Sequence, residues 1–282
     1  MKKILLPTDF SNNAWNSMFT ALKLFDRQVC EFLILHTYQP DAGGLLADRG
    51  EKQLWELYED LKKESEARMA EVTGYLEKEY HNPHHRFRSI CMQGELIGVI
   101  RDLSEKEAID MVVMGTQGAT GAKRVFMGSN TVRVIRSMPR HPVLAVPQSY
   151  DLQRVQKVLF PTAFLDPLED FELRPLLEIV ESWKAELLIV YVTSEFRLTD
   201  KQEGHKKQLE ELLEGVRHRF CEVPLEVNVS KTLAHFAREK GADLIALVHH
   251  KHPFFDTIIH ESVVKRVAFE TEFPLLILPL WG

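Results

Sequence analysis

The chain has 282 residues, enough for two domains of ordinary size, and 45% of them are hydrophobic, so each half can bury a core. The formal net charge of −6 excludes the basic surface typical of nucleic-acid binding, and no apolar run reaches the roughly 18 residues that a membrane helix needs. The N-terminal apolar stretch is too short for a signal peptide. Cysteines 30, 91 and 221 form no C-x-x-C pair, so we expect a reduced, cytoplasmic protein.

The N-terminal residues predict a strand, a helix and a second strand. Lys3 to Thr8 is predicted to form the first strand, and Pro7 lies at its end, where a missing N–H is tolerated. Ser11 is a good N-cap for a helix to about Phe25. Glu31 to Thr37 is predicted to form the next strand.

A long polar helix is predicted from Glu51 to Tyr80. It is followed by a turn, with the histidines 81, 84 and 85 expected on its exposed side, by a strand from Arg86 to Met92 and by a helix from Glu95 to Lys106. The helical spacing of the long helix is carried by six apolar residues, namely Leu54, Leu57, Leu61, Met69, Val72 and Leu76.

The stretch from residue 110 to residue 147 contains a strand, a glycine-rich loop, a helix and another strand. Met111 to Met114 is apolar throughout, as expected for a strand buried on both faces. Glycines follow at positions 115, 118, 121 and 128, and a helix is expected from Ser129 to about Met138. Val143 to Val146 is predicted as the fifth strand. The first turn of a helix that begins at Ser129 offers unpaired N–H groups that favour an anion.

Alternation of strands and helices predicts an α/β fold with a doubly wound parallel sheet. We expect a Rossmann-like strand order of 3-2-1-4-5, in which the first and fourth strands are neighbours. Ligands bind such sheets at the carboxyl ends of the strands, where the strand order reverses. Pro7, Thr8 and Asp9 are therefore expected to face the same crevice as Gly115.

The second half of the chain repeats this pattern. Residues 158–162 resemble residues 4–8, residues 242–248 resemble residues 109–115, and residues 273–279 resemble residues 141–147. Leu187 to Val192 stands for the second strand, and Gln202 to Phe220 is expected to form the second helix. The chain is thus predicted to be a tandem duplication with domains at 1–147 and 154–282, joined by a linker at 148–154.

The second copy differs in the residues that would touch a phosphate. Ala163 replaces Asp9, and Val248 and Lys251 replace Gly115 and Gly118. His260 and Glu261 stand where the first copy has Gly128 and Ser129. A valine does not adopt positive φ cheaply and a glutamate repels phosphate, so we expect no phosphate site in the second half.

The spacing Gly115-x2-Gly118-x9-Gly128-Ser129 is not a Walker A loop, because no Gly-Lys-Ser/Thr follows the first glycines. It resembles the nucleotide loop of the universal stress protein family, which also has an adenine nucleotide alpha hydrolase-like fold. A glycine-rich connection without a ligand is the alternative interpretation of the glycines alone.

The resemblance covers nearly the whole chain, as two tandem domains, and implies that the first domain binds an adenine nucleotide, usually ATP. It implies that Asp9 contacts the nucleoside, that the backbone of Thr37 meets the adenine edge, and that Met114 and Gly115 contact the ribose. Asp9 is also the acidic candidate for Mg²⁺. The phosphate-loop positions implied are Gly118, Gly128, Ser129 and Asn130, with Thr131 one residue beyond on the first helical turn.

Three functions are compatible with the sequence. A nucleotide-dependent regulatory module of the stress response is the first, because no general base or catalytic triad can be assembled from the spacing. A slow ATPase or self-phosphorylating protein, with Ser129 or Thr131 as phosphate acceptor, is the second. The third is a nucleotide-free scaffold that dimerises through Val143–Val146 and Leu275–Leu278 as sheet edges. A homodimer is expected in any case.

Histidines 249, 250, 252 and 260, with Asp256 and Glu261, crowd one loop of the second half. Imidazole and carboxylate groups are ligands for transition metals. Since HHKH is not a recognised ligand spacing, no metal site is assigned here.

Overall fold

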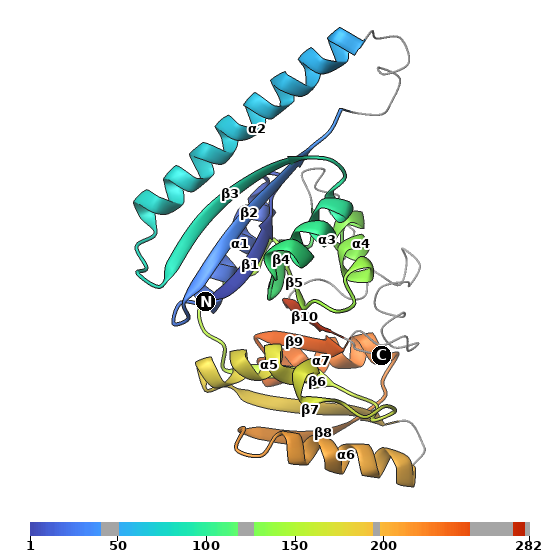
Figure 1. The fold of residues 1–282 in the computed structure, drawn as a ribbon. Coiled ribbons are helices and arrows are strands. Elements are labelled where there is room, and N and C mark those ends of the chain that lie inside the picture. The colour runs from blue at the N-terminus through green and yellow to red at the C-terminus, as the bar shows by residue number, and fades with distance from the viewer. Residues whose placement is uncertain (41–50, 118–126, 194–197, 249–272, 280–282) are drawn as a thin grey trace.

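The computed structural model describes residues 1–40, 51–117, 127–193, 198–248 and 273–279 (Figure 1). The elements of the first half are β1 (Lys2–Pro7), α1 (Asn12–Leu24), β2 (Cys30–Tyr38), α2 (Glu51–Glu79), β3 (His85–Gln93), α3 (Leu96–Glu107), β4 (Met111–Gly115), α4 (Ser129–Ser137) and β5 (Val143–Val146). The elements of the second half are β6 (Lys157–Pro161), α5 (Asp170–Trp183), β7 (Glu186–Thr193), α6 (Asp200–Leu212), β8 (His218–Pro224), α7 (Val229–Lys240), β9 (Leu244–Val248) and β10 (Leu275–Leu278).

The ten strands of the described residues form one continuous sheet in the order β3-β2-β1-β4-β5-β10-β9-β6-β7-β8. Within each half the neighbouring strands are parallel and follow the predicted 3-2-1-4-5 order. The two halves meet where β5 and β10 pair antiparallel, with Leu144 opposite Leu276. The α/β fold class predicted from the sequence is confirmed.

Two apolar layers cover the two faces of the sheet. One layer packs α1, α2, α5 and α6 against the strands, and the other packs α3, α4 and α7. Each layer includes residues from both halves, so the core is continuous across the β5–β10 junction. Because both faces are covered, β1, β4 and β5 read as near-continuous apolar runs.

Local signals place the first helix correctly. The Ser11 hydroxyl accepts a hydrogen bond from the Ala14 N–H at 3.2 Å, as predicted for an N-cap.

Within the described residues, no helix combines the length and the apolarity that crossing a bilayer requires. The three cysteines are free thiols, and burial raises the pKa of the Cys30 thiol to about 11.

Two predictions about local structure were wrong. The helix expected from Gln202 to Phe220 ends at Leu212, because the chain turns at Gly215 with φ +83°, and the edge strand β8 follows. His85 is not on an exposed turn: it is 8% exposed and its Nε2 lies 3.0 Å from the Phe25 carbonyl oxygen. Its ring also stacks on Tyr80.

The edge strands proposed for dimerisation are not edges. β5 and β10 pair with each other inside the chain, so neither offers a free edge to a second molecule. The strands at the two ends of the sheet are β3 and β8 instead. Dimerisation through Val143–Val146 and Leu275–Leu278 is therefore excluded as long as this pairing holds.

Candidate functional site

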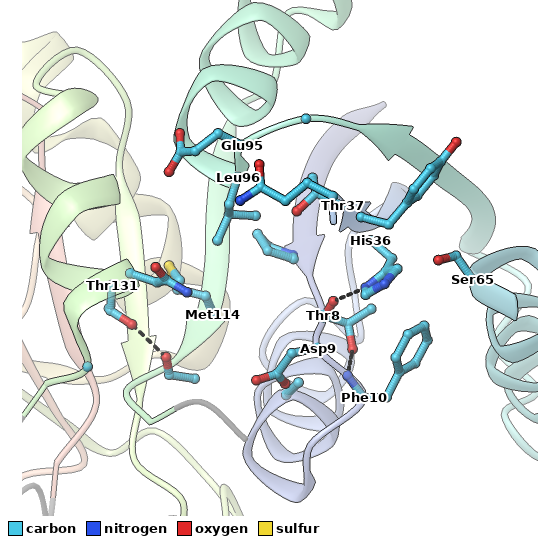
Figure 2. A pocket seen from close by; sticks show the side chains of 18 of the residues that line it. Thr8, Asp9, Phe10, His36, Thr37, Ser65, Glu95, Leu96, Met114 and Thr131 are labelled. Atoms are coloured by element: carbon cyan, nitrogen blue, oxygen red, sulfur yellow. Dashed lines mark hydrogen bonds between the residues drawn. The ribbon is translucent and has the colours of Figure 1, made fainter. Parts of the chain in front are cut away.

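A cavity of about 570 Å³ opens at the carboxyl ends of β1, β2 and β4 (Figure 2). This is the point where the strand order of the first half reverses, since β1 lies between β2 and β4. Ten residues singled out from the sequence line it: Pro7, Thr8, Asp9, Thr37, Met114, Gly115, Gly128, Ser129, Asn130 and Thr131. Gly118 lies outside the described residues.

The end of β1 turns sharply into the cavity. The Thr8 hydroxyl accepts a hydrogen bond from the Phe10 N–H at 3.0 Å, and Phe10 has φ +63° (Figure 2). The Asp9 carboxylate accepts from the Ser11 N–H at 3.0 Å, just before α1. This turn places the exposed Asp9 side chain on the cavity wall.

The end of β2 is tied to the end of β1. Nδ1 of His36 lies 2.8 Å from the Thr8 carbonyl oxygen, and the His36 and Phe10 rings are 4.4 Å apart between centroids (Figure 2). Thr37 follows on the cavity side. Two strand ends and one turn thus form a fixed wall next to Asp9.

The start of α4 forms the opposite wall. Its N-cap, Gly128, provides no side-chain cap, so the first helical turn keeps N–H groups for a ligand. The Gly128 N–H donates to the Thr116 carbonyl, which closes the base of the loop between β4 and α4. Ser129 and Asn130 are exposed in the cavity.

Thr131 has a structural contact of its own. It is 2% exposed, and its hydroxyl donates to the Gly115 carbonyl at 2.9 Å. That hydroxyl holds α4 to the end of β4, which disfavours Thr131 as a phosphate acceptor. Of the two acceptors considered from the sequence, Ser129 is the exposed one.

Asn13 supports the loop from below and was missed in the sequence. It is 3% exposed; with its oxygen toward Thr116, the amide accepts from the Thr116 N–H at 3.2 Å and donates to the Val146 carbonyl at 3.1 Å. A Cβ at Gly115 would lie 2.6 Å from the Asn13 side chain. A polar residue on the buried face of α1, two positions after the N-cap, is the sequence signal that would have identified it.

Helix α2 contributes a wall that sequence reasoning did not foresee. Leu61, Glu64, Ser65 and Arg68 line the cavity. The Arg68 guanidinium lies 4.1 Å from the centroid of the Phe10 ring, a cation–π contact. These residues are far from Asp9 in the sequence, and only the fold brings them to the same cavity.

Two more charged residues line the cavity between α3 and α4. Glu95 is the N-cap of α3, and Arg133 lies one turn into α4. Their side chains form an ion pair with a distance of 2.9 Å between Arg133 Nη2 and Glu95 Oε1. Glycine spacing gave no hint of either residue.

The corresponding place in the second half is arranged differently. Thr162 and Phe164 repeat the turn, with the Thr162 hydroxyl accepting from the Phe164 N–H at 3.1 Å and φ +54° at Phe164. However, Gln202 of α6 donates to the Ala163 carbonyl at 2.9 Å, and His205 Nδ1 lies 2.9 Å from the Phe164 carbonyl oxygen. Helix α6 therefore hydrogen-bonds to the backbone of this turn, whereas α2 reaches the turn of the first half through the contact of Arg68 with the Phe10 ring.

The last residue of β9 differs from that of β4 as well. Val248 pairs with Leu278 in the register position that Gly115 has opposite Val146. The histidine cluster at 249–260 lies outside the described residues. Within the part of the chain that the structure describes, no group of three or more histidine, cysteine, aspartate or glutamate residues is placed to hold a metal ion.

Comparison with known proteins identifies similar chains. The family model of the universal stress protein family matches residues 1–147. Universal stress proteins MJ0531 and MJ0577 of Methanocaldococcus jannaschii are 30% and 28% identical over 148 and 153 residues, about 51% of this chain and 81% and 94% of theirs. A universal stress protein structure from Archaeoglobus fulgidus shares the fold over 98% of both chains, with a TM-score of 0.70 and 19% identity.

Proposed function

Because this chain belongs to the universal stress protein family, we propose that it is a regulatory module that binds one ATP, in the cavity of its first half. The observation that carries the proposal is that ten residues picked from the sequence line one cavity at the reversal of strand order. A volume of about 570 Å³ is in the range of small-molecule sites. Bound ATP would set the surface that the protein presents to a partner.

Each wall of the cavity suits one part of the nucleotide. We assign Asp9 to the ribose or a bound Mg²⁺, and the backbone at Thr37 to the adenine edge. Met114 and Gly115, at the end of β4, are assigned to the ribose. The uncapped start of α4 is assigned to the phosphates, since its N–H groups and dipole favour an anion.

One site per chain is proposed because the two halves differ at the turn after the first strand and at the end of the fourth strand. Gln202 and His205 occupy the carbonyl groups of the turn with hydrogen bonds. Ala163 offers no carboxylate, and Val248 stands at the position of Gly115. These differences support a single site, since the second half lacks counterparts of the Asp9 carboxylate and of Gly115.

Calorimetric titration of the full chain with ATP tests the proposal. We expect saturable binding with a stoichiometry near one. Asp9→Ala should weaken ATP by about 1.5–3 kcal/mol, the range for hydrogen bonds to charged groups. The control Asp102→Ala removes an exposed carboxylate of α3 outside the cavity and should bind like the wild type. A stoichiometry near two, or an Asp9→Ala variant with wild-type affinity, contradicts these assignments.

A further inference from the structure

Two helices begin at the cavity and differ in how their N-termini are capped. α3 is capped by its own carboxylate: Oε2 of Glu95 accepts from the N–H groups of Ile97 at 3.0 Å and Gly98 at 3.2 Å. α4 starts at Gly128 without a side-chain cap. The start of α3 is thus already neutralised by an anion, whereas the start of α4 is left to accept one.

The second oxygen of Glu95 connects the two helices. Oε1 pairs with Arg133 Nη2 at 2.9 Å, and both side chains line the cavity. The Glu95 side chain is 44% exposed and the Arg133 side chain 56%, so the pair is accessible from the cavity. Glu95 is held in place by its cap bonds, and the long Arg133 side chain is the partner that can change position.

From this geometry we infer that Arg133 distinguishes ATP from ADP by exchanging Glu95 for the terminal phosphate. The inference rests on the proposed function and names the residue that reads the length of the phosphate chain. With ADP or AMP, Arg133 stays on Glu95. A third phosphate on the first turn of α4 brings a larger negative charge to the guanidinium than the single carboxylate does.

The exchange is favourable for two physical reasons. A guanidinium presents a planar fork of donors that matches phosphate oxygens, and hydrogen bonds between charged groups are about twice as strong as neutral ones. An exposed carboxylate–arginine pair is worth about 0–1 kcal/mol, so little is lost when it opens. One effect acts in the opposite direction: the Glu95 carboxylate keeps its negative charge after Arg133 leaves, and this charge repels the phosphate.

The same exchange opens the ion pair that links α3 to α4. In the pair, Glu95 and Arg133 join the starts of the two helices across the cavity. When ATP holds Arg133, this link is open, and Glu95 keeps only its own helix capped. A triphosphate therefore changes the surface between α3 and α4 and a diphosphate does not.

Titration of the full chain with ATP, ADP and AMP, with and without Mg²⁺, tests the role of Arg133. Arg133→Gln should weaken ATP by about 10- to 150-fold and leave AMP unchanged, because only the terminal phosphate loses its partner. Arg133→Lys keeps the charge without the fork and should lie between. Glu95→Gln can still accept the cap bonds and should tighten ATP by about two- to fivefold.

The control is Arg101→Gln, which removes one exposed positive charge from α3 outside the cavity and should leave all three affinities unchanged. Equal weakening of ATP, ADP and AMP by Arg133→Gln, or weaker ATP binding by Glu95→Gln, overturns the role of Arg133 while leaving the nucleotide site in place. Wild-type protein that binds none of the three nucleotides overturns the proposed function and this inference together.

Discussion

The Asn13 side chain occupies the space beside Gly115 that any larger residue at position 115 would need. The Asn13 amide bridges β5 and the residue after Gly115, and a Cβ at position 115 would meet it at 2.6 Å. Real Cβ atoms do not approach a buried group so closely, so one of the two would have to shift. Gly115 is therefore required by the space that Asn13 occupies.

Gly115→Ala should lower the free energy of unfolding by about 1–3 kcal/mol, as overpacking does. In an Asn13→Ala background the same change should cost less, because the side chain that it meets is gone. The coupling between the two changes should reach about 0.5–3 kcal/mol in a double-mutant cycle measured by urea unfolding.

The control for this cycle is Gly74→Ala in α2, where a Cβ would meet nothing within 4 Å. It should stabilise the protein by about 0.5–1 kcal/mol, since alanine is the better helix residue. If Gly115→Ala costs the same with and without Asn13, the contact does not explain the glycine.

Glu107 gives a second prediction at the scale of residues. Arg88 donates to both of its carboxylate oxygens at 3.1 and 2.7 Å, and with Lys3 nearby it holds the Glu107 pKa at about 2. The folded pKa lies below the ordinary 4.5, so the ionised form stabilises the fold. This contribution is complete above pH 4.5 and is lost as the pH falls toward 2.

Glu107→Gln should therefore lower the melting temperature at pH 7, and the difference from the wild type should shrink as the pH falls from 4.5 to 3. Glu77→Gln, an exposed position in α2, serves as the control and should leave the profile unchanged. A difference that is the same at pH 7 and pH 3 would show that charge is not the cause.

Helix α2 is the element whose two ends behave differently. Met69, Val72 and Leu76 are 0–3% exposed against the sheet. Leu54 and Leu57, one or two turns from its start, are only half-buried. Figure 1 shows the start of α2 extending beyond the edge of the sheet at β3. The buried end fixes the helix, and the residues just before it line the cavity.

Substitutions along α2 should follow this division. Met69→Ala should cost about 2–5 kcal/mol of stability, as expected for a buried side chain that leaves a cavity. Leu54→Ala should cost less than about 1 kcal/mol, because its side chain is already partly in water. Urea unfolding of both variants measures the two costs, and equal values would contradict the division.

The sequence predicted α2 from Glu51 to Tyr80, within one residue of the observed Glu51–Glu79. Periodicity reports which face of a helix is apolar, but whether that face is covered depends on the reach of the sheet. β8 was missed for a similar reason: as an edge strand it is half-exposed and carries Arg219 and Glu222 among its apolar residues. The exposure of the start of α2 and the pairing of β8 both depend on contacts that form only after folding.

The candidate site shows the same limit. Glycine spacing and the strand context led to ten residues that share one cavity. Asn13, Arg68, Glu95 and Arg133 were not found, because the glycine motif does not include them and they belong to four different helices or their caps. Only the order of the strands brings these helices together.

At the scale of the whole molecule, the antiparallel pairing of β5 with β10 makes the chain one body. Leu144 and Leu276 face each other across it, and both belong to the same apolar layer. Tyr150 strengthens the junction, since its hydroxyl donates to the Asp243 carbonyl at 2.9 Å. Cutting the chain between the halves would expose two apolar strands.

Residues 1–150 produced alone should therefore self-associate, with β5 pairing to β5 of a second copy in place of β10. Light scattering after size exclusion measures the mass of the eluting species. For residues 1–150 alone we expect the mass of a dimer or of a larger species. A half that stays monomeric at its highest soluble concentration would show that the junction is not needed to cover β5.

Because the two halves belong to one chain, the pairing of β5 with β10 does not depend on the protein concentration. Two separate copies would meet at a rate and to an extent set by their concentration, whereas a tether gives the partner strand a fixed, high local concentration. The β5–β10 junction therefore forms within each single molecule, even in a very dilute solution. Two identical copies would also have to share every substitution, whereas here Ala163 and Val248 could arise on one side while Asp9 and Gly115 were kept on the other.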